Sequence, residues 1–229
     1  MKLNIILTGA TGMVGEGVLL ECLRAPDVAA ILLLGRRASG YAHHPKVREL
    51  LLPDFQELAA VESQLVGYQA CFFCAGVSAV GLRKAEYERL TFDLTLHVAQ
   101  TLVRLNPAMT FEYVSGAGTD GTEQSRQHWA RVKGRTENAL LALPFRAAYL
   151  FRPGYLHPTP GQRHVLKMYR YFSWLYPVVR RLAASYVSTM QELGQAMLNA
   201  ARAGAPRPVL EVRDLVALAH RPAPTPGAA

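Results

Sequence analysis

The chain has little cysteine: only Cys22, Cys71 and Cys74 among 229 residues. Three thiols cannot supply the dense disulfides of a small secreted scaffold. Cys71 and Cys74 have the spacing of a redox or zinc pair, but they lie within or at the end of one apolar segment. A redox pair normally opens a helix, and a zinc site needs a second pair of ligands. We therefore expect buried, reduced thiols and no metal site.

The chain also lacks long hydrophobic runs and long runs of basic residues. The longest stretch without charge, residues 63–82, is interrupted by glycine, serine and glutamine, so it predicts a loop, a strand and a loop rather than a membrane span. The formal net charge is +8, yet the basic residues occur in local pairs and triplets. This distribution favours phosphorylated ligands and disfavours nucleic acid as a partner. The chain starts directly with a strand-like segment, which leaves no room for a signal peptide, and we expect a cytoplasmic protein.

What the sequence does contain is a glycine-rich turn near its start. The apolar segment 3–8 runs into three glycines at intervals of three residues and then into an apolar helical pattern. Such a turn leaves the first N–H groups of the helix facing open space, which suits a pyrophosphate. Gly9 permits the sharp turn, Gly12 lets backbone approach phosphate, and Gly15 lets the helix pack on its strand. The predicted cofactor-binding residues of this turn are Gly9, Thr11, Gly12, Met13 and Val14.

No acidic residue follows the next apolar strand, and this absence bears on the cofactor. Proteins that prefer NAD usually place Asp or Glu there, to accept hydrogen bonds from the ribose hydroxyls. Here the strand at 30–34 is followed by Gly35, Arg36 and Arg37. Guanidinium groups at this point can meet the 2′-phosphate of NADP. We expect NADP as the cofactor, with NAD as the less favoured alternative.

Strand-like and helix-like patterns alternate along the chain, which predicts an α/β fold with a Rossmann-type, doubly wound parallel sheet. The predicted strands are 3–8, 30–34, 47–52, 69–74, 110–115 and 145–151. The predicted helices are 13–24, 56–65, 84–105, 126–142, 163–176 and 189–203. We expect one NAD(P)-binding domain over residues 1–221 and a disordered, Pro/Ala-rich tail over residues 222–229.

Residues 152–221 depart from this alternation and predict a small C-terminal helical cap on the substrate side. A Pro/Gly-rich loop over 152–161 precedes a basic, aromatic-rich helical pattern at 163–176. Such a helix can pack as a lid over the carboxyl edge of the sheet, lie weakly on a membrane surface, or form an interface with a partner. A homodimer is one such partner arrangement. The lid is the first expectation.

The carboxyl ends of the later strands supply further candidates, because open parallel sheets bind their ligands there. Asp54 and Phe55 follow the third strand, and the Asp54 carboxylate could accept from the adenine amino group. Small residues after the fourth strand let the ribose of a nucleotide approach backbone. The remaining candidates are Ala75 and Gly76 after the fourth strand, Ser115 after the fifth, Lys133 in the next helix, and Pro153 and Gly154 after the sixth.

Together these motifs resemble the short-chain dehydrogenase/reductase superfamily. They are most similar to its atypical, epimerase-like NAD(P)-binding branch, which includes the Tat-interacting oxidoreductase-like proteins. The resemblance covers residues 1–155 and implies that Ser115 polarises the substrate oxygen. It also implies that Lys133 binds the nicotinamide ribose and lowers the pKa of a catalytic tyrosine. The matching segments are Thr8–Gly15, Gly35–Arg37, Val114–Ser115, Val132–Gly134 and Arg152–Gly154.

The tyrosine that the resemblance implies is absent, because Trp129 stands four residues before Lys133. An indole N–H donates a hydrogen bond but cannot pass on a proton at neutral pH. Three interpretations stay open: another acid acts, with Tyr155 first and His128 and Asp120 next; the substrate needs little proton assistance; or catalysis is lost and nucleotide binding is kept. The resemblance thus implies an NADP-binding oxidoreductase or epimerase for an unidentified small molecule. The alternative is a non-catalytic dinucleotide-sensing or interaction module.

Overall fold

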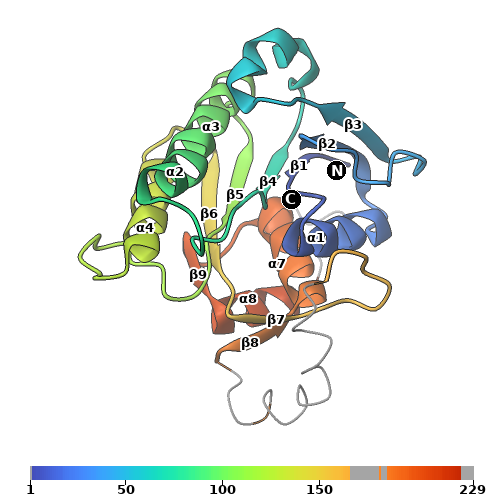
Figure 1. The fold of residues 1–229 in the computed structure, drawn as a ribbon. Coiled ribbons are helices and arrows are strands. Elements are labelled where there is room, and N and C mark those ends of the chain that lie inside the picture. Colours follow the sequence, from blue (N-terminus) through green and yellow to red (C-terminus); the bar gives the residue numbers. More distant parts are fainter. Residues whose placement is uncertain (1, 166–180, 182–184, 223–229) are drawn as a thin grey trace.

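The computed structural model describes residues 2–165, 181 and 185–222 (Figure 1). Its centre is a seven-stranded sheet with the order β3-β2-β1-β4-β5-β6-β9, in which every neighbouring pair is parallel. The strands are β1 (Leu3–Thr8), β2 (Val28–Gly35), β3 (Val47–Leu51), β4 (Ala70–Phe73), β5 (Thr110–Val114), β6 (Ala147–Arg152) and β9 (Val209–Glu211). The prediction of a Rossmann-type, doubly wound α/β fold is confirmed.

Helices cover both faces of this sheet (Figure 1). One face carries α1 (Met13–Arg24), α7 (Met190–Ala203) and α8 (Val212–Ala219). The other carries the 3-10 helix η1 (Phe55–Gln64), α2 (Lys84–Glu88), the π-helical turn η2 (Arg89–Asp93), α3 (Leu94–Leu105) and α4 (His128–Leu141). Successive residues of β1 alternate between the two cores: Ile5 and Leu7 pack under α1 and α7, while Ile6 packs under α3. Burial of this central strand on both faces explains why Ile5, Ile6 and Leu7 are apolar in succession.

The winding of the sheet reverses at β1. This strand pairs with β2 on one side and with β4 on the other, so Thr8 lies opposite both Leu34 and Phe73. The turn after β1 therefore meets the ends of β2 and β4 at a single edge. Open α/β sheets bind their ligands in the crevice at such a switch point.

Most predicted elements are present, with informative differences. All six predicted strands are found, and the helices predicted at 13–24, 126–142 and 189–203 correspond to α1, α4 and α7. The predicted helix at 56–65 is the 3-10 helix η1, and the one at 84–105 is interrupted by the π-helical turn η2. The helix predicted at 163–176, which carries the lid, membrane and partner alternatives, falls outside the described residues after Val165, as does the tail after Pro222.

The C-terminal region contains elements that the sequence pattern does not predict. β7 (Tyr155–His157) and β8 (Val187–Thr189) form a separate two-stranded parallel pair. Strand β9 extends the main sheet beside β6, and α8 packs on α7. Arg202 of α7 donates to both carboxylate oxygens of Asp27, at 2.8 and 2.6 Å, in the loop between α1 and β2. This region therefore adds a strand and two helices to the Rossmann core.

The described residues contain neither a membrane-spanning helix nor a metal-binding cluster. Within them, no helix is both long and apolar enough to cross a membrane. Nor do three or more His, Cys, Asp or Glu side chains in this part of the chain come together in a way that could hold a metal ion. Burial raises the pKa of the Cys22 and Cys71 thiols well above the usual value, which keeps both protonated.

Candidate functional site

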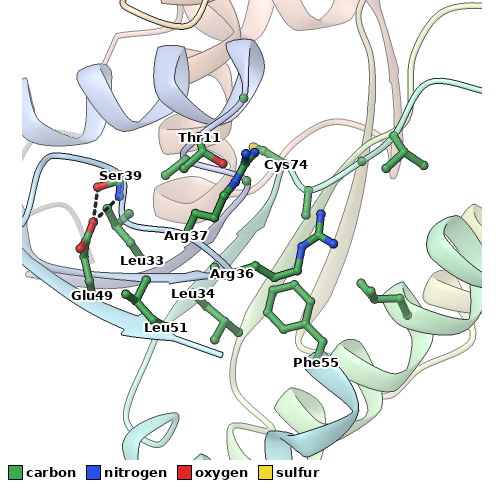
Figure 2. Close-up of a pocket in the computed structure, with 18 of the residues that line it drawn as sticks. Thr11, Leu33, Leu34, Arg36, Arg37, Ser39, Glu49, Leu51, Phe55 and Cys74 are labelled. Carbon is green, nitrogen blue, oxygen red and sulfur yellow. Dashed lines mark hydrogen bonds between the residues drawn. The ribbon is translucent and has the colours of Figure 1, made fainter. Parts of the chain in front are cut away.

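A cavity opens at the carboxyl ends of β1, β2 and β4, where the winding reverses (Figure 2). The glycine turn, the loop after β2, the end of β4 and the start of η1 line it, among them Gly9, Gly12, Arg36, Arg37 and Phe55. Ala75 and Gly76 line it after β4. Its volume is about 210 Å³, below the ~300–1,000 Å³ of sites that enclose a whole drug-sized ligand. The size suits one end of a dinucleotide.

The three glycines of the turn have different roles. Gly9 has φ +76°, and a Cβ there would lie 2.6 Å from the Cys74 carbonyl oxygen. A Cβ on Gly15 would lie 2.1 Å from the Gly9 carbonyl oxygen, so α1 can pack this closely only with glycine. A Cβ on Gly12 would meet only the Gly9 carbonyl oxygen, at 3.4 Å, and Gly12 is exposed. The packing of the protein thus requires Gly9 and Gly15, whereas Gly12 keeps open space beside the cavity.

Helix α1 begins at this turn without a capping side chain. Within the described residues, the N–H groups of Met13 and Val14 donate no hydrogen bond. Unpaired N–H groups at a helix N-terminus, together with the helix dipole, attract anions. The start of α1 therefore offers donors to a phosphate beside the cavity, as the glycine pattern predicts.

Arg36 and Arg37 extend from the end of β2 into the cavity, and both are exposed. Figure 2 shows them between the turn that carries Thr11 and the ring of Phe55. Neither guanidinium forms an ion pair within the part of the chain that the structure describes. Asp54 is not part of the cavity lining, and its carboxylate accepts from the Gln56 N–H at 2.9 Å as the N-cap of η1. Two unpaired cations in one cavity favour a phosphorylated ligand.

The loop after β2 is tied to β3 by Ser39 and Glu49, which both line the cavity (Figure 2). The Ser39 N–H donates to Glu49 Oε1 at 2.7 Å, and the Ser39 hydroxyl donates to the same oxygen. The Tyr41 N–H donates in turn to Ser39 Oγ at 3.0 Å. This loop is therefore held in place from the sheet side.

A second carboxylate, Glu16 of α1, holds the same loop from the opposite side. Glu16 is fully buried and accepts from the Tyr41 hydroxyl at 2.8 Å. It also accepts from the N–H groups of Arg163 and His164, at 3.0 and 2.6 Å. The Arg163 guanidinium lies over the Tyr41 ring, 4.8 Å from its centroid. Glu16 thus joins α1, the loop after β2 and the segment that follows β7.

At the ends of β5 and β6, polar side chains are bonded to one another. The Ser115 hydroxyl donates to Glu137 Oε1 at 2.5 Å and lies 3.2 Å from the Phe151 carbonyl oxygen. Arg152 donates to the same Glu137 carboxylate, with Nε–Oε1 at 3.0 Å and Nη2–Oε2 at 2.5 Å, and reaches Glu211 at 3.0 Å. Ser115 is 3% exposed and Glu137 is 1% exposed. The Ser115 side chain is thus engaged by an internal ion pair.

Lys133 lies beside this group. Its Nζ donates to the backbone carbonyl oxygen of Ser115. Burial lowers the pKa of the Lys133 ammonium from its usual value, while the Glu137 carboxylate acts in the opposite direction. The structure therefore brings Ser115 and Lys133 together and adds Glu137 and Arg152 to the group.

Trp129 occupies the position of the missing tyrosine. Its indole N–H donates to Gln127 Oε1 at 3.0 Å, and its ring packs on Gly118, where a Cβ would lie 3.1 Å from Cη2. Asp120 accepts four hydrogen bonds from its own loop, including one from the Thr122 hydroxyl at 2.6 Å. The Thr122 hydrogen bond, followed by backbone hydrogen bonds, lowers the pKa of Asp120, so this side chain stays ionised at neutral pH and is unsuited to donate a proton.

The remaining candidates shape the backbone near β7. The Pro153 carbonyl oxygen accepts from the Ala117 N–H at 2.8 Å. A Cβ on Gly154 would lie 2.2 Å from the Tyr186 carbonyl oxygen, which also accepts from the Tyr155 N–H at 2.8 Å. Tyr155 is half-buried and does not line the cavity. His128 starts α4, with its ring 6.1 Å from that of Tyr87.

Four residues of the site escape sequence reasoning. Glu16, Glu49 and Glu137 have apolar or helical surroundings in the sequence, and nothing local marks their partners, which lie 10 to 148 residues away. Ser39 carried a usable signal, since a small hydroxyl residue two positions after an arginine pair fits a phosphate-binding loop.

The fold of this chain is similar to that of solved Rossmann-fold enzymes, among them two proteins described as epimerases. The enzyme WbmG of Bordetella bronchiseptica, solved in complex with NAD and UDP, matches 100% of this chain and 82% of its own at a TM-score of 0.67 and 14% identity.

Two relatives are similar to this chain over most of its length. The chain is 28% identical over 211 residues to "Protein fmp52, mitochondrial" of Emericella nidulans, which covers 86% of both chains. It is 25% identical over 206 residues to "Protein HTATIP2" of Rattus norvegicus, which covers 86% of this chain and 80% of that protein. No protein-family model matches the chain. The resemblance to the atypical short-chain dehydrogenase/reductase superfamily is confirmed.

The expected cytoplasmic location is wrong by the same comparison, because several fungal relatives are mitochondrial by name. The expectation rested on the strand at the start of the chain. The position of a strand is not a signal for a compartment.

Proposed function

We propose that this chain binds NADP(H), with the adenosine end of the dinucleotide in the cavity beside the glycine turn. The observation that carries the proposal is the pair of unpaired guanidinium groups, Arg36 and Arg37, in one cavity with the uncapped start of α1. A pyrophosphate needs N–H donors, and a 2′-phosphate needs cations. The cavity offers both within a few residues of the sheet's switch point.

The dinucleotide would be held by groups that the protein leaves available. The N–H groups of Met13 and Val14 would bind the pyrophosphate, and the space beside Gly12 would admit it. Ala75 and Gly76 would run along the nucleotide, and Lys133 would approach the nicotinamide ribose. When bound, the nicotinamide supplies hydride chemistry. The similar enzyme WbmG was solved with NAD. This supports binding of a dinucleotide but does not favour NADP over NAD.

The reaction class that fits best is that of an NADP(H)-dependent oxidoreductase or epimerase acting on a small molecule. Ser115, Lys133 and Tyr155 remain the proposed catalytic residues. In this proposal Tyr155 supplies the proton that Trp129 cannot, and Ser115 turns from Glu137 toward a bound substrate.

A second candidate function is dinucleotide sensing without turnover. Two observations favour it: the Ser115 hydroxyl is engaged by Glu137 at 2.5 Å, and an indole stands at the tyrosine position. In this role the bound dinucleotide would stabilise one arrangement of the segment after β7, which Glu16 already joins to α1.

The binding proposal is tested by titrating the protein with NADPH and NADH and following nicotinamide fluorescence. One charge-assisted phosphate contact contributes roughly 1.5–3 kcal/mol, so NADPH is expected to bind about ten- to a hundredfold more tightly. Equal affinities, or tighter NADH binding, contradict the assignment to NADP.

Turnover separates the two candidates. NADPH oxidation is measured for wild type, Trp129→Tyr and Tyr155→Phe across a panel of small aldehydes and quinones. If Tyr155 is the proton donor, the wild-type protein oxidises NADPH and the Tyr155→Phe variant does not. A protein that lost only its acid gains activity in Trp129→Tyr, because Lys133 can depress the pKa of the new phenol. Inactivity of wild type and both variants, with NADPH binding intact, supports sensing.

A further inference from the structure

One carboxylate uses the hydrogen-bond donors that a phosphate at this site would need. Glu49 lies on β3 opposite Leu33 of β2, and its Oε1 accepts from both the N–H and the hydroxyl of Ser39. Ser39 is 6% exposed, so its two donors are aimed at this oxygen rather than at solvent. Two converging donors on one anionic oxygen are also the arrangement that binds phosphate oxygens.

The same cavity holds the cations. Ser39 and Glu49 line it together with Arg36 and Arg37 (Figure 2). Among the described residues of the lining, Glu49 is the single carboxylate. A 2′-phosphate near Arg36 and Arg37 would therefore be attracted by two guanidinium groups and repelled by one carboxylate, and would find the Ser39 donors already in use.

The loop does not depend on Glu49 alone. The Tyr41 hydroxyl donates to the buried Glu16 at 2.8 Å, and the Tyr41 N–H donates to Ser39 Oγ at 3.0 Å. Ser39 can therefore change its acceptor while the loop stays attached to α1.

We propose that Glu49 is a specificity-determining residue that limits the affinity of this site for 2′-phosphorylated adenosine nucleotides. Its carboxylate accepts both Ser39 hydrogen bonds, as a phosphate would. A 2′-phosphate can therefore bond to Ser39 only when Glu49 releases these donors. The proposal rests on the proposed function, since it requires adenosine to bind in this cavity. It predicts that the preference for 2′-phosphorylated over unphosphorylated adenosine nucleotides is smaller than Arg36 and Arg37 would produce without Glu49.

The test uses the full chain and two half-ligands, 2′,5′-ADP and 5′-AMP, with affinities from isothermal titration calorimetry. Glu49→Gln keeps an oxygen that can accept from Ser39 but removes the charge. Removing one like charge near a solvent-accessible phosphate is expected to tighten 2′,5′-ADP binding about three- to tenfold and to change 5′-AMP binding less than about twofold. Adding Ser39→Ala to Glu49→Gln is expected to reduce this gain, because the phosphate then loses the Ser39 hydroxyl as a donor.

Glu57→Gln is the matched control, because Glu57 is exposed on η1 and outside the cavity lining. It changes the net charge equally and is expected to change neither affinity. Thermal melts verify folding. Should Glu49→Gln fail to fold, Glu49→Asp withdraws the carboxylate by one methylene and is likewise expected to tighten 2′,5′-ADP binding.

Three results overturn the proposal in distinguishable ways. Unchanged 2′,5′-ADP binding by Glu49→Gln, with wild type still preferring 2′,5′-ADP, leaves the proposed function standing and refutes the role of Glu49. Selective weakening of 5′-AMP binding shows that Glu49 accepts from the ribose hydroxyls instead. Binding of neither half-ligand to wild type, at millimolar concentration, refutes the proposed function and this inference together.

Discussion

The two ends of the candidate site differ in how far the protein satisfies its own polar groups. At the ends of β1 and β2, Arg36 and Arg37 have no ion-pair partner and α1 starts uncapped, within the described residues. At the ends of β5 and β6, Ser115, Glu137 and Arg152 bond to one another in a buried group. Unused donors and cations in a cavity favour a ligand, whereas a closed buried network first of all stabilises the fold. The end at β1 and β2 is thus open to a ligand, and the end at β5 and β6 is held by internal bonds.

The largest effect is expected from Arg152→Ala, at the closed end. Glu137 would be left as a buried carboxylate without its cation, which costs about 3–5 kcal/mol of unfolding free energy. Arg202→Ala is the control: it removes a similar two-bond contact, but the Asp27 side chain is 34% exposed, against 1% for Glu137, so a loss of about 1 kcal/mol is expected. Urea unfolding measures both. An Arg152→Ala loss no larger than that of Arg202→Ala would show that the buried group is not what stabilises this end.

At the open end, Gly12→Asp is expected to weaken dinucleotide binding at least about a hundredfold, or about 2.7 kcal/mol. The new carboxylate would stand in the space for the pyrophosphate and repel it. Stability should be retained, because a Cβ on Gly12 meets only one atom, at 3.4 Å. Gly15→Ala should do the reverse, losing about 1–3 kcal/mol of stability through overpacking. Calorimetric titration and thermal melts measure the pair, and wild-type affinity in a folded Gly12→Asp protein would place the ligand elsewhere.

Arg36 and Arg37 are expected to act on one cofactor more than on the other. Arg36→Ala and Arg37→Ala should each raise the Kd of NADPH about ten- to a hundredfold, the value of one charge-assisted phosphate contact, and affect NADH less. Arg126→Ala, on an exposed loop outside the cavity, controls for the change in net charge. Fluorescence titration gives the three values. Equal losses for NADPH and NADH would mean that the arginines bind a group common to both cofactors.

The smallest effect is expected from Ser115→Ala. Glu137 keeps its bonds to Arg152, so the lost hydrogen bond should cost about 1–1.5 kcal/mol of unfolding free energy and leave NADPH affinity unchanged. Urea unfolding and fluorescence titration measure the two quantities. A protein of unchanged stability that loses an NADPH-dependent turnover would instead assign Ser115 to the reaction.

The sequence predicts the open end well because its signals are local. The glycine spacing, the strand before it and the helix after it lie within residues 3–24, and Arg36 and Arg37 directly follow a buried strand. Each of these features depends on backbone geometry that a few neighbouring residues determine.

The closed end is harder to predict because its partners are brought together by the sheet. Ser115 and Glu137 are 22 residues apart, and Arg152 lies a further 15 residues along the chain. The helical pattern shows that Glu137 lies one turn after Lys133 but does not show which acceptor it provides. The short β9 has too few residues for a recognisable alternation, and the π-helical turn after Glu88 keeps the apolar pattern of a continuous helix.

Calorimetric titration of wild type with NADPH and, in parallel, with 2′,5′-ADP shows which end of the site carries the binding free energy. If the open adenosine end carries most of the binding, the half-ligand should bind within about tenfold of NADPH, a difference of at most about 1.4 kcal/mol. If NADPH binds tightly and 2′,5′-ADP binds more than about a thousandfold more weakly, the affinity arises at the nicotinamide end, and the account of the two ends is wrong.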